Sequence, residues 1–146
     1  NIVRIYATNM NGDISDFNIY TSSLVRFLYE KKNLLVLLDN PDYITSNDAY
    51  RVNKEFRQVI NLFYSQGNII FKVASEGFKK GMKSIATDSS SLYHFAVGDN
   101  HMIRIELDNK KRTSVCSFNN QKMAQPLIRI FDTYFPDCES INISTR

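Results

Sequence analysis

The hydrophobic pattern of this chain changes its period about two-thirds of the way along. Up to residue 91, short apolar runs alternate with stretches in which apolar residues recur at helical spacing, and from residue 92 they alternate with period two. The run Leu34–Leu38 is apolar at every position, which is typical of a strand covered on both faces. Strands separated by helices pair in parallel through right-handed crossovers, whereas strands joined by tight turns pair antiparallel. The sequence therefore predicts a sheet that is parallel in its first half and antiparallel in its second.

The first half predicts the order β-α-β-α-β. We expect strands over residues 2–8, 34–38 and 68–74, with one helix in each gap and Gly67 as the stop of the second helix. The first helix is built on Leu24, Phe27 and Leu28. The apolar stripe of the second helix consists of Val52, Phe56, Val59, Ile60 and Phe63. The candidate caps of the two helices are Thr21, Ser22 or Ser23 and Asn47 or Asp48.

The second half predicts short strands joined by turns. A short amphipathic turn over residues 76–82 and a flexible polar loop over 84–91 come first. Strands over 93–97 and 102–107 then flank a tight turn, a further strand covers 113–118, and Pro136 stops a closing helix. The chain shows neither internal repeats nor a linker. The sequence therefore predicts a single α/β domain over residues 1–146, with a mixed sheet and a closing helix.

Composition excludes several classes of protein. The chain has 146 residues and a net charge of +3, and no apolar run approaches the roughly 20 residues of a membrane span, so we expect no membrane partner. Cys116 and Cys138 have neither zinc-site spacing nor a disulfide pattern, which predicts a reducing compartment, the cytoplasm or the nucleus, with a cytoplasmic location favoured. The five glycines form no phosphate-binding loop, so we expect no cofactor.

The two histidines of the chain are better explained as solvated side chains than as ligands of a metal ion. His94 and His101 lie seven residues apart, and a metal would also need a carboxylate such as Asp99 on the same face of the sheet. Histidines at edges and turns are more often solvated, so no metal is expected. Neither cysteine has a nucleophile motif, and the serine cluster near residue 90 lacks one as well.

The most informative stretch runs from Leu92 to Asp99 and continues in Met102–Glu106. Its strand-and-turn pattern and the order of elements along the chain resemble the phospholipase D-like superfamily, whose signature is H-x-K-x4-D followed by G-S-x-N. The alignment places Asp99 on the family's Asp, His94 on its Lys and Leu92 on its His. In active members that His attacks phosphorus and the Lys neutralises phosphate oxygens. Leu92 can do neither, so the resemblance implies the fold without the activity.

The second half of the signature is also altered. Glu106 and Leu107 fall where the family has Gly-Ser, and Asn109 falls on its Asn. A carboxylate at Glu106 would repel a phosphodiester. Active members build one site from two motif copies, and members with a single copy pair as homodimers. The resemblance therefore implies a homodimer, with Asp99 and Asn109 as the matching positions.

The register of the hairpin gives a separate prediction. If Asp99-Asn100 is a two-residue turn, His94 opposes Ile105 and shares its face with Leu92, Ala96 and Ile103. The other face then carries Tyr93, Phe95 and Val97 opposite Glu106, Arg104 and Met102. Arg104 and Glu106 would form a structural ion pair there or a remodelled polar site. A one-residue slip would exchange these partners.

Positive charge gathers in two segments, each of which we expect to be a turn. These segments are Lys79-Lys80-Lys83 and Lys110-Lys111-Arg112. If they converge near the hairpin, they make a rim that attracts anions, with Tyr93 or Phe95 available for stacking on a base. Most such runs are ordinary solvated turns. Nucleic acid is thus a possible partner.

Three functions follow from these observations. The favoured one is a catalytically inactive phospholipase D-like domain that acts as a binding, regulatory or dimerisation module, as a homodimer or in a protein complex. The first alternative is a divergent, metal-independent phosphodiesterase or nuclease with His94 as nucleophile and Lys79, Lys80 or Arg104 supplying charge. The second is a module that binds nucleic acid or another anion. Enzyme activity stays open, with its absence favoured.

Overall fold

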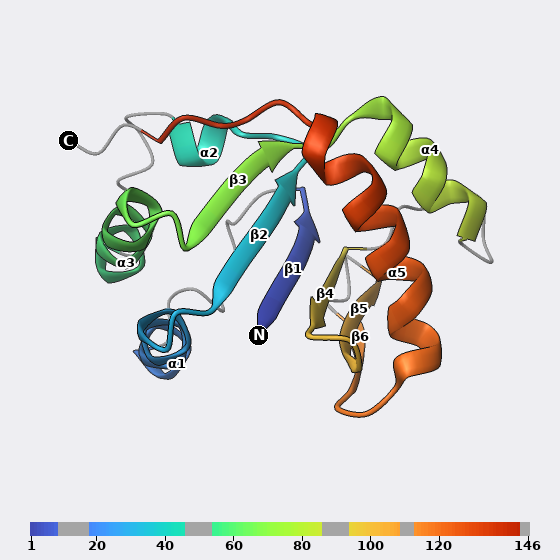
Figure 1. Ribbon diagram of the computed structural model, residues 1–146, viewed down its shortest axis with the longest axis horizontal. Coiled ribbons are helices and arrows are strands. Elements are labelled where there is room, and N and C mark those ends of the chain that lie inside the picture. Colours follow the sequence, from blue (N-terminus) through green and yellow to red (C-terminus); the bar gives the residue numbers. More distant parts are fainter. Residues whose placement is uncertain (9–17, 46–53, 86–93, 109–112, 144–146) are drawn as a thin grey trace.

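One mixed sheet organises the molecule in the computed structural model (Figure 1). The structure describes residues 1–8, 18–45, 54–85, 94–108 and 113–143. Within them, the strand order is β3-β2-β1-β4-β5-β6. The strands are β1 (Ile2–Ala7), β2 (Asn33–Leu38), β3 (Ile69–Val73), β4 (Phe95–Gly98), β5 (Met102–Asp108) and β6 (Thr113–Ser117). β1, β2 and β3 pair in parallel and the remaining pairs are antiparallel, which confirms the predicted change of strand direction.

The helices cover both faces of this sheet and make two cores. They are α1 (Asn18–Tyr29), α2 (Asp42–Thr45), α3 (Lys54–Ser65), α4 (Glu76–Ile85) and α5 (Gln121–Tyr134), followed by the 3-10 turn η3 (Phe135–Asp137). Figure 1 shows α1 and α3 on one side of the sheet and α4 and α5 on the other. The first core joins α1 and α3 to Leu34, Val36 and Leu38. The second joins α4 and α5 to Leu37, so β2 is buried on both faces as its sequence predicts.

Two glycine features shape the helices. Gly67 ends α3 with a positive φ of 76°, where its N–H donates to Tyr64 O at 3.0 Å and the N–H of Asn68 donates to Phe63 O at 3.1 Å. These two bonds form a Schellman motif, in which glycine avoids the strain that a side chain brings. In α4, Gly77 and Gly81 leave room for Tyr134 of α5, whose ring carbons lie 3.0 and 3.1 Å from where a Cβ would be.

An arginine fork holds β1 to α5. Arg4 Nε lies 2.7 Å from Asp132 Oδ1, and Arg4 Nη2 lies 2.8 Å from Asp132 Oδ2. Paired bonds of this kind are stronger and more directional than a single contact. The side chain of Asn120 begins α5 by accepting the N–H of Met123 at 3.1 Å. Ala124, Leu127 and Phe131 then bury one stripe of the helix against the second core.

Two helices differ from the sequence prediction. α1 begins at Asn18, so Thr21, Ser22 and Ser23 lie inside the helix and do not cap it. α4 is a helix of ten residues, where a short turn was predicted, because Phe78 and Met82 bury one stripe of it. Lys79, Lys80 and Lys83 therefore lie on a helix and not in a turn. Asn47, Asp48 and Val52, and most of the predicted loop over 84–91, lie outside the described residues.

The predicted hairpin register is wrong by one residue. Phe95 opposes Ile105, Val97 opposes Ile103 and Gly98 opposes Met102, so the turn holds three residues, Asp99–His101. The predicted register would have set Phe95 across from Arg104 and Val97 across from Met102, with Ile103 and Ile105 on the opposite face. Burial of Phe95, Val97 and Ile103 in the second core outweighs the preference for a two-residue turn. As a result, Arg104 opposes Ala96 and shares a sheet face with it.

Candidate functional site at the carboxyl edge of the sheet

The side of the sheet to which successive strands are added changes at β1. From β1 the chain adds β2 and β3 on one side, and after α4 it returns to place β4 on the other side of β1. In open α/β sheets, ligands bind outside the carboxyl ends of the strands at such a reversal. Because β4 runs antiparallel to β1, His94, which precedes β4, lies at this same edge. The carboxyl ends of β1 and β2 and the start of β4 therefore define the candidate site.

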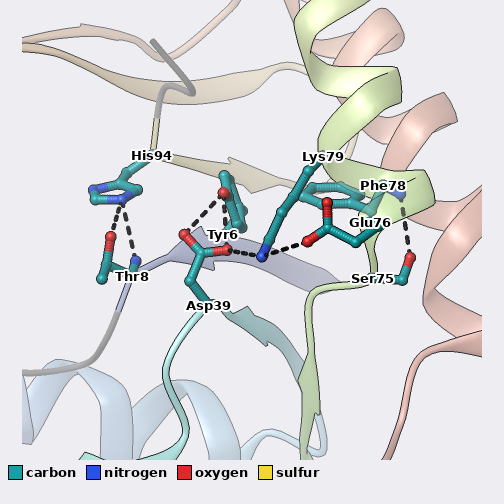
Figure 2. A network of polar contacts seen from close by, with 8 residues as sticks. All are labelled: Tyr6, Thr8, Asp39, Ser75, Glu76, Phe78, Lys79 and His94. Atoms are coloured by element: carbon teal, nitrogen blue, oxygen red, sulfur yellow. Dashed lines mark hydrogen bonds and ion pairs between the residues drawn. The ribbon is translucent and has the colours of Figure 1, made fainter.

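The first polar group of the edge is centred on Asp39, the residue after β2 (Figure 2). The hydroxyl of Tyr6, on the buried face of β1, lies 3.1 and 3.0 Å from the two carboxylate oxygens of Asp39. From the first turn of α4, Lys79 Nζ lies 3.6 Å from Asp39 Oδ1 and 3.2 Å from Glu76 Oε1. One carboxylate therefore links β1, β2 and α4.

The environment of this group shifts two ionisations. Burial raises the pKa of the Tyr6 hydroxyl above its ordinary value, and the negative charge of Asp39 raises it further. For Lys79, burial opposes the charged form, but the hydrogen bond to Glu76 and the charge of Asp39 outweigh it and hold its pKa above the usual range. Tyr6 therefore stays a neutral donor and Lys79 a cation over the whole neutral range.

The second polar group is centred on His94 (Figure 2). Thr8, just after β1, donates its N–H to His94 Nε2 at 3.1 Å, and its hydroxyl oxygen lies 2.7 Å from the same nitrogen. On the other side of the ring, His94 Nδ1 lies 3.7 Å from Glu106 Oε2. Arg104 Nη1 lies 4.0 Å from that oxygen. The side chains of His94 and Glu106 are only 18% and 17% exposed.

These contacts assign the tautomer of His94. A backbone N–H can only donate, so Nε2 accepts from Thr8 and carries no proton. The ring proton of neutral His94 is then on Nδ1, which faces Glu106. The lone pair that a nucleophilic or metal-binding Nε2 would use is already engaged by the backbone. Tyr6 links the two polar groups, since its ring meets that of His94 edge-on at 5.8 Å between centroids.

At the described part of the edge, carboxylates outnumber permanent cations. Asp39, Glu76 and Glu106 face only two permanent cations, Lys79 and Arg104. Among the described residues, no group of three or more His, Cys, Asp or Glu side chains could hold a metal ion. The arrangement can exchange hydrogen bonds with a polar ligand, but its described charges do not form the cationic cradle that a phosphate group needs.

Asp99 lies at the other end of β4, five residues from His94, which is about 16 Å along a strand. Its carboxylate accepts the N–H of Ile2 at 2.9 Å, and this hydrogen bond lowers the pKa of Asp99. Asp99 and His94 therefore do not meet in one site. Lys80 is exposed on α4. The other predicted positions, Leu92, Tyr93, Asn109, Lys110, Lys111 and Arg112, lie outside the described residues.

Sequence reasoning missed four residues of this edge. They are Tyr6, Thr8, Asp39 and Glu76. Asp39 directly follows a predicted parallel strand and Thr8 is the last residue of another. Polar residues at such strand ends are a usable signal, because the carboxyl ends of parallel strands meet at one edge. Tyr6 and Glu76 carry no comparable signal, since Tyr6 lies inside the predicted first strand and Glu76 in the segment predicted as a short turn.

Comparison with known proteins identifies no relative of this chain. No protein-family model matches the chain, and no curated protein and no solved structure is significantly similar to it. Across the described residues, none of the helices combines the length and the apolar content needed to cross a bilayer.

Proposed function

We propose that this chain is a phospholipase D-like domain without phosphodiesterase activity, which works as a binding or regulatory module. The proposed family rests on the strand pattern ending at Asp99 and on the order of elements along the chain. The loss of activity rests on two positions. Leu92 stands where the family has its nucleophilic histidine, and His94, two positions further along the sequence, is the residue that could replace this nucleophile.

The observation that carries the proposal is the bond from the Thr8 N–H to His94 Nε2. A histidine that attacks phosphorus needs a free lone pair directed at the substrate. At His94 that lone pair accepts a backbone hydrogen bond, and Nδ1 faces the carboxylate of Glu106. Attack would require His94 to give up the Thr8 N–H. The contacts of His94 are those of a residue that ties β4 to the end of β1.

The charges near His94 support the same conclusion. Lys79, one of the proposed phosphate-binding cations, is engaged by both Asp39 and Glu76. Arg104 and His94 share the carboxylate of Glu106. Because carboxylates repel a phosphodiester, these contacts also count against the alternative of a nucleic-acid-binding module at this edge.

Hydrolysis of a chromogenic phosphodiester and of labelled DNA in EDTA tests the proposal. The wild type, His94→Ala and His101→Ala are compared, and circular dichroism checks that each is folded. His101 is a matched control, because it is the other histidine of the chain and lies in the turn at the far end of β4. We expect no turnover in any of the three. Turnover by the wild type and by His101→Ala that is lost in folded His94→Ala would overturn the proposal.

A further inference from the structure

The two edge strands of the sheet, β3 and β6, differ in whether further residues pair with their outer sides. At the β3 edge, residues after η3 pair with the strand: the N–H of Val73 donates to Glu139 O at 2.8 Å, and the N–H of Ile141 donates to Phe71 O at 2.9 Å. Lys72 and Ser140 form a bridge between these bonds. At the opposite edge, β6 pairs with β5, and no residue in the described ranges pairs with its outer side. β6 is therefore the open edge of the described sheet.

The composition of β6 lacks the usual protection of an open edge. Residues 113–118 read Thr-Ser-Val-Cys-Ser-Phe, without a charge or a proline. Proteins commonly protect open edges with charges, prolines or bulges, because exposed N–H and C=O groups recruit other strands. The one irregularity in pairing lies between Glu106 and Asp108, and the pairs from Ser114 to Ser117 are regular. This stretch is therefore suited to pairing with another strand.

Apolar side chains on and beside this strand are exposed. Val115, at the centre of β6, is 44% exposed, and Phe118, directly after it, is 80% exposed. Val115 opposes Ile105, which packs against the second core, so Val115 lies on the sheet face that α5 covers. A strand added beside β6 would extend this apolar face outward from the core.

We propose that β6 pairs antiparallel with β6 of a second copy of the chain, across a twofold axis at Val115. In such a contact each strand meets its own sequence in reverse, and a charge near the axis would face a like charge. β6 is neutral along its whole length, so this repulsion is absent. Val115 then opposes Val115, Ser114 opposes Cys116 and Thr113 opposes Ser117, which matches apolar with apolar and small polar with small polar side chains.

This inference goes beyond the proposed function and does not depend on the phospholipase D-like resemblance. It is tested without any phosphodiester, so the two proposals can fail separately. A pair of five-residue strands makes a contact smaller than the roughly 1,200 Å² of a standard interface. We therefore expect a dimer that dissociates on dilution.

Sedimentation velocity from low micromolar to submillimolar concentration measures the assembly. We expect a monomer–dimer equilibrium for the wild type and a monomer for Val115→Lys, in which two ammonium groups would meet at the axis. Leu62→Lys is the matched control, because Leu62 is 46% exposed on α3, away from β6. It should dimerise like the wild type. A wild type that is monomeric throughout, or a dimer that persists in folded Val115→Lys, would overturn the proposal.

Disulfide trapping tests the position of the axis. Val115→Cys in a Cys116→Ser background should give a covalent dimer when a mild oxidant removes two electrons from the opposed pair of thiols. Leu62→Cys in the same background is the control and should stay monomeric on a non-reducing gel. Equal cross-linking of the two variants would mean random collision and would count against the proposed pairing. A peptide that competes for pairing with β6 should dissociate the wild-type dimer in sedimentation velocity, and this result would support the proposed pairing.

Discussion

The hydroxyl of Tyr6 and the carboxylate of Asp39 lie 3.0 Å apart at the carboxyl edge of the sheet, although the two residues are 33 positions apart in the chain. The ring of Tyr6 is fully buried and meets Phe78 of α4 edge-on at 4.8 Å between centroids. The phenol therefore has an apolar body in the second core and a polar tip at the edge. It connects the packing of the core to the charges of the candidate site.

This relationship predicts a pH dependence of stability. The folded-state pKa of Tyr6 is raised, whereas an unfolded tyrosine ionises near pH 10. The unfolded chain therefore loses this proton first, and the free energy of unfolding falls as pH rises above about 10. Below that pH the contribution of Tyr6 is fully present. The raised pKa of Lys79 acts in the same direction.

The variant Tyr6→Phe isolates the contribution of the Tyr6 hydroxyl to the pH dependence of the free energy of unfolding. At pH 8 the variant should lose about 1 kcal/mol, the value of a typical hydrogen bond. Between pH 8 and 11 its stability should fall less than that of the wild type, because Phe has no proton to release. Urea unfolding at both pH values measures the difference. Parallel pH curves for the two proteins would contradict the raised pKa.

A second prediction concerns His94 as a structural acceptor. His94→Ala leaves the half-buried N–H of Thr8 without its partner, which should cost about 1–2 kcal/mol of unfolding free energy. His94→Gln should cost less, because the amide oxygen of Gln can accept the same N–H. Urea unfolding at neutral pH measures both variants. Equal losses in the two would show that ring packing against Tyr6, and not the hydrogen bond, is what His94 contributes.

The sheet could be predicted from the sequence, because the strongest signals for its strands and helices are local. Leu34–Leu38 is buried on both faces, and Gly67 ends a helix with a positive φ, as their patterns predict. The hairpin register was missed because a local signal conflicts there with burial in the core. The Asp99-Asn100 pair favours a two-residue turn, whereas burial of Phe95 and Val97 in the second core places Ile105 and Ile103 opposite them.

The candidate site was harder to predict, because its contacts depend on the strand order. Tyr6 meets Asp39 only because β1 and β2 are neighbours with their carboxyl ends at one edge. Lys79 meets Asp39 only because α4 begins at that edge, and the sequence indicated a turn in its place. Local patterns thus identify elements, while the pairing of polar side chains follows from how the elements are arranged.

A third prediction concerns the close contact between α4 and α5. An alanine at Gly81 favours helix by up to about 1 kcal/mol, but its Cβ would lie 3.1 Å from a ring carbon of Tyr134. In the wild-type background these two effects oppose each other, so Gly81→Ala should give little gain or a loss. In a Tyr134→Ala background it should stabilise by about 1 kcal/mol. A double-mutant cycle of urea unfolding measures this coupling, and additive effects would contradict it.

A fourth prediction tests the end of α3. Gly67 has a φ of 76°, and no atom lies within 4 Å of the place where its Cβ would be. The cost of Gly67→Ala is therefore conformational and not steric, about 1 kcal/mol for a side chain in the left-handed region. Gly67→Asn should lose less, because Asn tolerates this region better than Ala. Urea unfolding of the two variants measures the order. Because replacing glycine also stiffens the unfolded chain, which by itself favours folding, the losses measure the strain in the folded state. Equal losses for Ala and Asn would contradict the account, since the left-handed conformation would then not distinguish the two side chains.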